Sequence, residues 1–229
     1  MIKLYSFSAT GRTQKISEYF SKSLGVDIID IDQKKIYENL CSNIAVVVFP
    51  VYCQNIPFPV KVALSNIKAE NFVIIATYGK KSFGNVIYDA TKLVCGNLIA
   101  AAYVPIGHTY LSEDVDFDCY LLEPILNRIS NPKTIKTPKF FKNPLADFIP
   151  EVRSRIGVKI KKTNACNSCN VCAEKCVMKA ISKGEINGNC IRCLRCVDAC
   201  PNKALTVKYN PLLTLYLKNT YKEKFKYFI

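Results

Sequence analysis

The most informative stretch of this 229-residue chain is Cys166-Asn167-Ser168-Cys169-Asn170-Val171-Cys172-Ala173-Glu174-Lys175-Cys176. Its cysteine spacing recurs in a second stretch, made of Cys190, Cys193, Cys196, Cys200 and the following Pro201. Each cysteine of the first stretch has its counterpart 24 positions later, and Ala180 has Ala204. Such an internal repeat predicts two similar halves related by a pseudo-two-fold axis.

Eight of the twelve cysteines fall in this repeat, a density that in a reducing cytosol indicates metal binding rather than disulfides. Three thiolates spaced by two residues can wrap one corner of a [4Fe-4S] cubane, while the fourth reaches the other cubane. Ligation is therefore expected to cross between the halves. We predict two clusters, one held by Cys166, Cys169, Cys172 and Cys200, the other by Cys190, Cys193, Cys196 and Cys176.

A pair of zinc sites is the main alternative, but zinc modules usually pair two short cysteine hooks across a longer gap. One departure from the cluster pattern is Val177, which follows Cys176 where proline is usual. The spacing is kept, so we expect ligation to be kept. Arg192 and Arg195 lie between ligands of the second hook; they either raise that cluster's potential or attract an acidic partner, or else form a solvated basic face.

The formal net charge of +14 is concentrated towards the end of the chain, where residues 151–229 carry 16 Lys or Arg against 5 Asp or Glu. Two clusters with four thiolates each would bring about −2 apiece when oxidised. A positive surplus remains, which favours an acidic redox partner through electrostatic steering. Nucleic acid is disfavoured, because the basic residues are dispersed and the aromatic residues form no stacking module.

The first 128 residues alternate short apolar runs with amphipathic stretches, which predicts a parallel α/β sheet. The expected strands are 2–7, 26–31, 44–49, 72–77 and 98–104, and the expected helices are 12–24, 58–66, 84–95 and 120–129. Five strands with intervening helices fit the flavodoxin-like order 2-1-3-4-5. In such a sheet ligands bind outside the carboxyl ends of the strands.

A phosphate-binding loop is predicted directly after the first strand, at Ser8-Ala9-Thr10-Gly11-Arg12-Thr13. Hydroxyls and free backbone N–H groups at a helix N-terminus can hold a phosphate dianion without lysines. Gly11 would let the backbone approach closely, although Ser and Thr also serve as ordinary helix caps. Arg12 either pairs with the phosphate or faces solvent.

Two further loops follow the third and fourth strands and are expected to border the same ligand. They read Pro50-Val51-Tyr52-Cys53-Gln54-Asn55 and Thr77-Tyr78-Gly79-Lys80-Lys81-Ser82-Phe83-Gly84-Asn85. Tyr52 and Tyr78 either stack on a ligand ring or pack against the protein. His108, the single histidine, is either a proton donor or an ordinary loop residue.

The loop at 8–13 matches the (Ser/Thr)-x-Thr-Gly-x-Thr phosphate loop of flavodoxins, and the cysteine repeat resembles that of bacterial two-cluster ferredoxins. Together they resemble the flavodoxin-ferredoxin fusion proteins of anaerobic bacteria and archaea. The resemblance implies a flavodoxin-like FMN-binding domain at 1–145, a linker at 146–159, a small α+β two-cluster ferredoxin domain at 160–208 and a tail at 209–229. We expect the tail to dock on its own protein, with a membrane surface or a partner as alternatives.

The resemblance implies an electron carrier that exchanges electrons between two [4Fe-4S] clusters, FMN and a redox partner protein. The alternatives are a flavin-dependent reductase of a small molecule, fed by its own clusters, and a redox sensor. The absence of a GxGxxG fingerprint disfavours direct NAD(P)H oxidation. We see no signal peptide and no apolar run of the ~18 residues that span a bilayer, so we expect a cytoplasmic protein that requires no membrane; a homodimer stays open.

Overall fold

The computed structural model describes residues 1–31, 41–79, 81–111, 116–143, 146, 150–218 and 224–229, with the backbone alone for 150–153. The chain divides into two compact units. Unit 1 comprises Met1–Asn143 and Tyr221–Ile229, and unit 2 comprises Pro144–Thr220. The chain therefore enters unit 2 from unit 1 and returns to unit 1 for its last residues.

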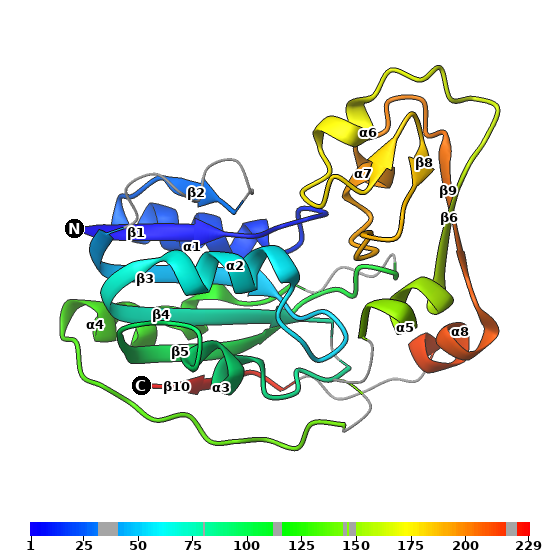
Figure 1. Cartoon of the computed structure of the whole chain (residues 1–229). Helices are drawn as coiled ribbons and strands as arrows, with labels where there is room; N and C mark the ends of the chain where they lie inside the picture. The colour runs from blue at the N-terminus through cyan, green and yellow to red at the C-terminus, as the bar shows by residue number, and fades with distance from the viewer. Residues whose placement is uncertain (32–40, 80, 112–115, 144–145, 147–149, 219–223) are drawn as a thin grey trace. The chain divides into compact units, whose positions relative to one another are not determined.

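Unit 1 is built on a six-stranded sheet in the order β10-β5-β4-β3-β1-β2 (Figure 1). Its parallel strands are β1 (Ile2–Ser6), β2 (Ile28–Asp30), β3 (Cys41–Pro50), β4 (Lys68–Tyr78) and β5 (Asn97–Pro105). The predicted order 2-1-3-4-5 is confirmed. Residues 45–49 of β3 are fully buried, as expected for a central strand that is covered on both faces.

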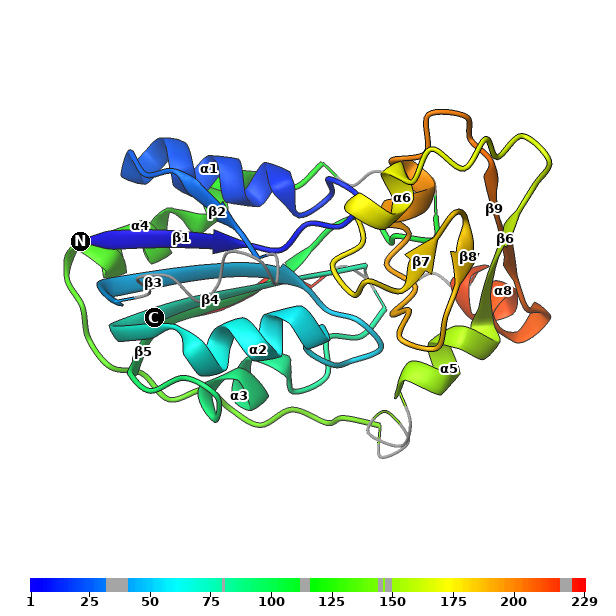
Figure 2. The same cartoon turned by 45° about the horizontal axis from the view of Figure 1, so that its top comes forward.

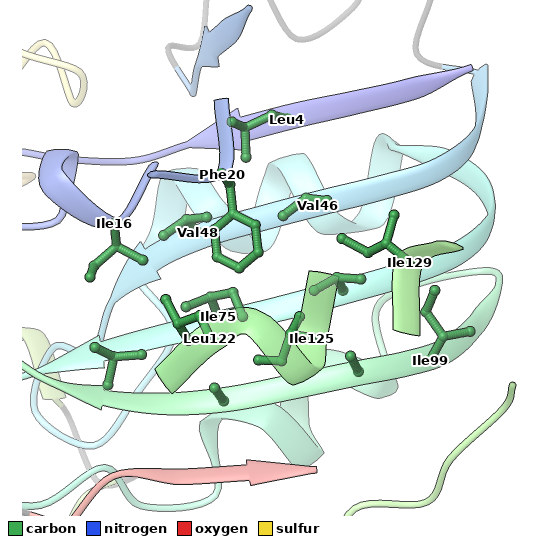
Figure 3. Packing of buried hydrophobic residues seen from close by; sticks show 14 of the residues in the cluster. Leu4, Ile16, Phe20, Val46, Val48, Ile75, Ile99, Leu122, Ile125 and Ile129 are labelled. Carbon is green, nitrogen blue, oxygen red and sulfur yellow. The ribbon is translucent and has the colours of Figure 1, made fainter. Parts of the chain in front are cut away.

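Helices cover both faces of this sheet. Figure 2 shows α1 (Gln14–Leu24) and α4 (Glu123–Ser130) on one face, and α2 (Phe58–Asn66) and α3 (Val86–Thr91) on the other. Helix α4 follows a short 3₁₀ helix, η1 (Cys119–Leu122). Figure 3 shows the core beneath the first pair, where α1 and α4 meet the sheet through Leu4, Ile16, Phe20, Val46, Val48, Ile75, Ile99, Leu122, Ile125 and Ile129.

Two elements of unit 1 differ from the sequence expectation. Helix α3 is shorter than the expected helix at 84–95. The tail adds a sixth strand, β10 (Lys226–Phe228), which pairs antiparallel with β5. The expectation that the tail docks on its own protein is therefore confirmed for this strand, whereas residues 219–223 lie outside the described part.

Unit 2 contains two small antiparallel sheets. Strand β6 (Val158–Lys162) pairs with β9 (Leu205–Tyr209), and β7 (Ile181–Ser182) pairs with β8 (Glu185–Ile186). Its helices are α5 (Pro150–Gly157), α6 (Val171–Glu174), α7 (Arg195–Asp198) and α8 (Pro211–Lys218). Helix α5 thus occupies much of the stretch where a linker was expected, and α8 extends unit 2 into the expected tail.

The 24-residue repeat of the sequence is also a repeat of backbone conformation. Left-handed φ angles occur at Ser168 (60°) and Arg192 (58°), at Asn170 (64°) and Leu194 (63°), and at Lys179 (48°) and Lys203 (47°). Helices α6 and α7 begin at equivalent positions of the two halves. The two halves of unit 2 therefore fold alike, as the repeat predicts.

No helix among the described residues is both long and apolar enough to cross a membrane.

Candidate functional site

Two cavities in unit 2 gather the eight cysteines of the repeat. Cys166, Cys169, Cys172 and Cys200 line the first, and Cys176, Cys190, Cys193 and Cys196 line the second. Each cavity takes three thiols from one half and the fourth from the other half, which is the grouping that crossed ligation requires. The two cavities are of similar size.

The fourth cysteine of each half receives a backbone hydrogen bond at its sulfur. The amide of Ala180 donates to Cys176 Sγ at 3.2 Å, and the amide of Ala204 donates to Cys200 Sγ at 3.3 Å. An N–H donor stabilises the thiolate that a metal cluster needs. The repeated alanines at 180 and 204 thus mark equivalent N–H···S contacts.

The thiols surround cavities rather than converge on a point. Among the described residues, no three His, Cys, Asp or Glu side chains come close enough to hold a single metal ion. Zinc needs four ligands at bonding distance of one centre, whereas a cubane places its ligands around a larger body. The crossed quartets of thiols fit the ligand set of [4Fe-4S] clusters.

Burial raises the pKa of two thiols of the second cavity, so these two are protonated when no metal is bound. It raises the pKa of Cys193 to about 11 and that of Cys196 to about 12. Metal binding must therefore release protons from these thiols.

The loop at 8–13 of unit 1 has the geometry of an anion-binding site. Gly11 has φ +78° and no neighbouring atom within 4 Å of the place where a Cβ would lie. Among the described residues, the amides of Thr10, Gly11 and Thr13 donate no backbone hydrogen bond. The hydroxyls of Thr13 and Thr77, both buried, lie 2.9 Å apart and tie the loop to the end of β4. A phosphate group fits this arrangement of amides at the start of α1.

Arg12 is directed to a neighbouring loop. Its Nη2 donates to the carbonyl of Leu111 at 2.8 Å, so at least one nitrogen of this guanidinium is bound within the protein. His108 lies in the same loop, and its Nδ1 accepts from the amide of Tyr110 at 3.1 Å. Burial, Lys81 and Arg12 lower the pKa of His108 to about 4, so the ring is neutral at pH 7.

The loop after β3 closes in a tight two-residue turn. Tyr52 and Asn55 exchange two backbone hydrogen bonds, of 3.0 and 2.8 Å, across Cys53 and Gln54. Both central residues have positive φ, 51° and 63°, which is the type I′ geometry. The amide of Val51 donates to the carbonyl of Thr77 at 2.7 Å. This bond holds the loop, and the end of β3 at Pro50, beside the end of β4.

Tyr52 and Tyr78 differ in environment. Tyr52 is half-buried and contacts the edge of Phe7, with ring centroids 6.3 Å apart. Tyr78 is 4% exposed, and its hydroxyl donates to the carbonyl of Lys224 at 2.7 Å and accepts from the Lys224 amide at 3.1 Å. Tyr52 therefore remains a candidate for ring stacking, whereas the contacts of Tyr78 favour the packing alternative.

The glycines of the second loop are placed where side chains would clash. A Cβ on Gly79 would lie 2.6 Å from His108 Cδ2, and one on Gly84 would lie 2.8 Å from the Gln54 carbonyl. Asn85 stands at the N-cap of α3 but makes no side-chain cap bond; its Oδ1 accepts from the amide of Phe140. The approach of Gly84 to Gln54 brings the loop after β4 against the loop after β3.

Sequence reasoning missed Lys142. Its Nζ donates to Asn55 Oδ1 at 2.9 Å and pairs with Asp89 Oδ2 at 3.2 Å, and its side chain is only 11% exposed. The next residue, Asn143, donates its amide to Gln54 Oε1 at 3.1 Å. Lys142 and Asn143 thus hold the turn after β3 in place, and no local sequence pattern signals such a long-range contact.

Comparison with known proteins identifies one segment of the chain. Residues 186–206 match the family model of the 4Fe-4S binding domain. This segment contains four cysteines of the repeat, Cys190, Cys193, Cys196 and Cys200, so the chain has a 4Fe-4S site and its general function is electron transfer. A search of curated proteins found no match.

Among solved structures, the chain is similar to the flavodoxin of Streptococcus pneumoniae TIGR4. The two are 15% identical, with a TM-score of 0.41, over 56% of this chain and 97% of that chain. A likeness at this level carries no argument, and the fold class rests on the strand order itself.

Proposed function

We propose that the chain is an electron-transfer protein that relays single electrons between two [4Fe-4S] clusters, a bound FMN and a redox partner protein. The observation that carries the proposal is the pair of cavities in unit 2, each lined by four thiols in the crossed grouping. The family match covers cysteines from both quartets, since Cys200 lines the first cavity and the other three line the second. With one cluster alone, one of these two thiol quartets would hold no metal.

Unit 1 supplies the flavin half of the proposal. When bound, the clusters would exchange one electron each, and FMN could take one or two. The amides of Thr10, Gly11 and Thr13 would hold the phosphate, and the Thr13–Thr77 hydroxyl contact keeps that loop in position. Tyr52, on a rigid two-residue turn, would border the ring. These groups lie at the carboxyl ends of β1, β3 and β4, where this fold binds ligands.

The electron carrier is favoured over a reductase with its own substrate by the state of the candidate proton donors. The hydroxyl of Tyr78 is engaged with both backbone groups of Lys224. His108 is neutral at pH 7 and its Nδ1 accepts a backbone hydrogen bond. Single-electron exchange with a protein partner needs no such donor.

The test is the cofactor content of the chain after anaerobic purification. Iron, sulfide, zinc and flavin are quantified on one sample, with visible spectra before and after dithionite. We expect about eight irons and one FMN per chain, as two cubanes and one flavin site require. Zinc without flavin would overturn the proposal, and about four irons would reduce it to a single cluster.

Two variants test the cofactor sites separately. Gly11→Val places a β-branched side chain at φ +78° in the proposed phosphate loop, so we expect FMN to be lost and iron to be kept. Gly25→Val is its matched control, because Gly25 has φ +63° and equally open space at the far end of α1; it should keep FMN. Cys193→Ala should lose iron and keep FMN. If either site variant lost both cofactors while the Gly25 variant kept both, the modular assignment would fail.

A further inference from the structure

The two cysteine cavities keep equivalent ligands but differ in part of their linings. Positions 24 apart line the two cavities, and at four of them a polar residue or proline of the first cavity is replaced by an apolar residue in the second. The pairs are Asn167 and Ile191, Asn170 and Leu194, Pro201 and Val177, and Asn202 and Met178. The cationic residue Arg195 also lines the second cavity. The two sites differ at these four positions, while every ligand is kept.

Exposure differs in the same sense. At the first cavity Cys169, Asn167, Ser168, Pro201 and Asn202 are exposed. Six residues that line the second cavity are buried, namely Val177, Ala180, Ile181, Cys190, Leu194 and Cys196. A group in the first cavity would thus have a ligand at the protein surface, whereas one in the second would have no exposed ligand.

We propose that the cluster held by Cys166, Cys169, Cys172 and Cys200 is the port at which the chain exchanges electrons with an acidic redox protein, and that the other cluster exchanges electrons only within the chain. This inference rests on the proposed function and specifies its partner site. Exchange between proteins slows steeply as the distance between redox centres grows. An acceptor can approach closest to the exposed ligand Cys169, because none of the four cysteines of the second cavity is exposed.

The charges around the first cavity fit an acidic partner. Lys183 lines the cavity and is exposed. Lys203 is exposed and lies between the lining residues Asn202 and Ala204. The nearby carboxylate of Glu185 is paired with Lys162 at 2.9 Å. Positive charge is therefore left at the rim, which would attract an acidic docking surface and speed its encounter.

The backbone keeps the rim of the first cavity close to its cluster ligand. Gly184 has φ +80°, and a Cβ there would lie 2.7 Å from Lys162 Cδ and 3.3 Å from Cys166 Sγ. The amide of Lys183 donates to Asn170 Oδ1 at 2.9 Å. The turn between β7 and β8, which contains Lys183, is thus held against the cysteine hook at Cys166 to Asn170.

The repeat provides a matched pair of variants for the test. Lys203 and Lys179 occupy equivalent positions with the same backbone conformation, φ 47° and 48°, and both are exposed. Lys203 lies beside the first cavity, and Lys179 lies between the lining residues Met178 and Ala180 of the second. Lys203→Glu and Lys179→Glu therefore change net charge equally at the two sites.

The measurement is the rate at which the dithionite-reduced, fully loaded protein is oxidised by substoichiometric ferricyanide, followed by stopped-flow absorbance. In this exchange one electron leaves a reduced cluster and converts ferricyanide to ferrocyanide, with no bond or proton transferred. At low ionic strength we expect Lys203→Glu to slow the reaction about three- to tenfold and Lys179→Glu to change it less than twofold. The cationic oxidant tris(phenanthroline)cobalt(III) should show the opposite sign with Lys203→Glu, and 0.5 M salt should remove both effects.

Equal effects of the two substitutions, or a larger effect of Lys179→Glu, would overturn the port assignment. Iron analysis and the electron paramagnetic resonance spectrum of each reduced variant are recorded first. A chain without iron-sulfur clusters would refute the proposed function, whereas two intact clusters with no difference between the variants would refute this inference alone.

Discussion

Lys142 shows how one side chain can hold a binding loop from a distance. It bridges Asn55 in the turn after β3 and Asp89 in α3, with little exposure to solvent. We predict that Lys142→Met lowers the free energy of unfolding of unit 1 by about 1–3 kcal/mol, because it leaves Asn55 and a partly buried carboxylate without their donor. FMN affinity should fall as well, since the turn that carries Tyr52 loses its anchor.

The matched control for this variant is Lys92→Met. Lys92 Nζ lies 4.0 Å from the same carboxylate, but its side chain is 60% exposed, and an exposed pair contributes little, about 0–1 kcal/mol. Thermal unfolding and flavin titration of the two variants provide the comparison. If Lys92→Met weakened flavin binding as much as Lys142→Met, a general loss of positive charge would be the cause rather than the position of Lys142.

His108 predicts a pH dependence of stability. Burial, Lys81 and Arg12 lower its folded-state pKa from 6.5 to about 4. Between these two values the unfolded chain binds a proton that the folded chain does not, so stability falls as the pH is lowered through this window and recovers as it rises. We expect a loss of about 2 kcal/mol between pH 7.5 and 5.

A neutral replacement tests this attribution. His108→Gln cannot titrate, so its stability should fall by about 2 kcal/mol less than that of the wild type over the same range. Urea unfolding of both proteins at pH 7.5 and 5 is the measurement, and acid effects on other groups cancel in the difference. Parallel pH profiles would show that His108 titrates normally in the folded state.

At the scale of elements, the sheet was the easiest feature to predict. Apolar β-branched runs such as Val46-Val47-Val48 and Val73-Ile74-Ile75 carry the signal for strands that are buried on both faces. The phosphate loop and the cysteine hooks were also visible, because their chemistry depends on local spacing. The crossed grouping of the thiols could be expected for the same reason.

Elements held by distant contacts could not be predicted. Strand β10 has three residues in a lysine-rich tail, and it forms because the edge of β5 and the rings of Tyr103 and Phe140 accept it. The segment around Phe140 and Lys142 has a loop-like composition, but it is held by hydrogen bonds to Asn85 and Asn55 in the loops after β4 and β3. In both cases the contacting residues lie far away in the sequence, so no local pattern signals the contact.

Removing β10 should destabilise unit 1 and expose the edge of its sheet. Deletion of residues 224–229 removes the three pairs with β5 and the contact of Phe228 with Phe140. We expect a loss of about 3 kcal/mol, comparable with truncation of a buried aromatic side chain, and self-association through the bare edge strand. Thermal unfolding and light scattering during size exclusion measure the two effects.

A milder pair of substitutions separates the contribution of the Tyr78–Lys224 hydrogen bonds from that of the strand pairing. Tyr78→Phe removes the hydroxyl that bonds both backbone groups of Lys224 and should cost about 1–2 kcal/mol. Tyr227→Phe alters a hydroxyl on β10 itself, on a residue that is 46% exposed, and should cost almost nothing. Equal stability of the deletion variant and the wild type would mean that β10 contributes nothing to unit 1.

At the scale of the whole molecule, the order of the units along the chain couples them. Unit 2, Pro144–Thr220, is inserted between the body of unit 1 and its last strand. Its own core is small, a buried cluster of Cys172, Ile181, Cys196 and Leu205 in which two residues are expected cluster ligands. A unit with so little apolar burial should depend on its metal to fold.

Iron removal should therefore loosen β10, which lies in the other unit. While unit 2 is folded, the amide of Asn210, just before α8, donates to the carbonyl of Gly157, at the end of α5, at 3.0 Å, which shortens the path that the chain must close. Once unit 2 unfolds, β10 must close a flexible loop through residues 144–220, at an entropic cost of about 4 kcal/mol. That cost is of the same size as the stabilisation from the contacts of β10, so the strand should detach for a large part of the time.

Hydrogen exchange of the intact chain is measured before and after iron is removed with a chelator. After removal, exchange should speed up at Ala101 to Tyr103, which pair with β10. The pairing of Tyr5 with Ile29 at the opposite edge should keep its protection, because no inserted unit interrupts that part of the chain. Unchanged exchange on β5 after iron loss would show that β10 docks independently of unit 2, and loss of protection at both edges would show that the two units unfold as one.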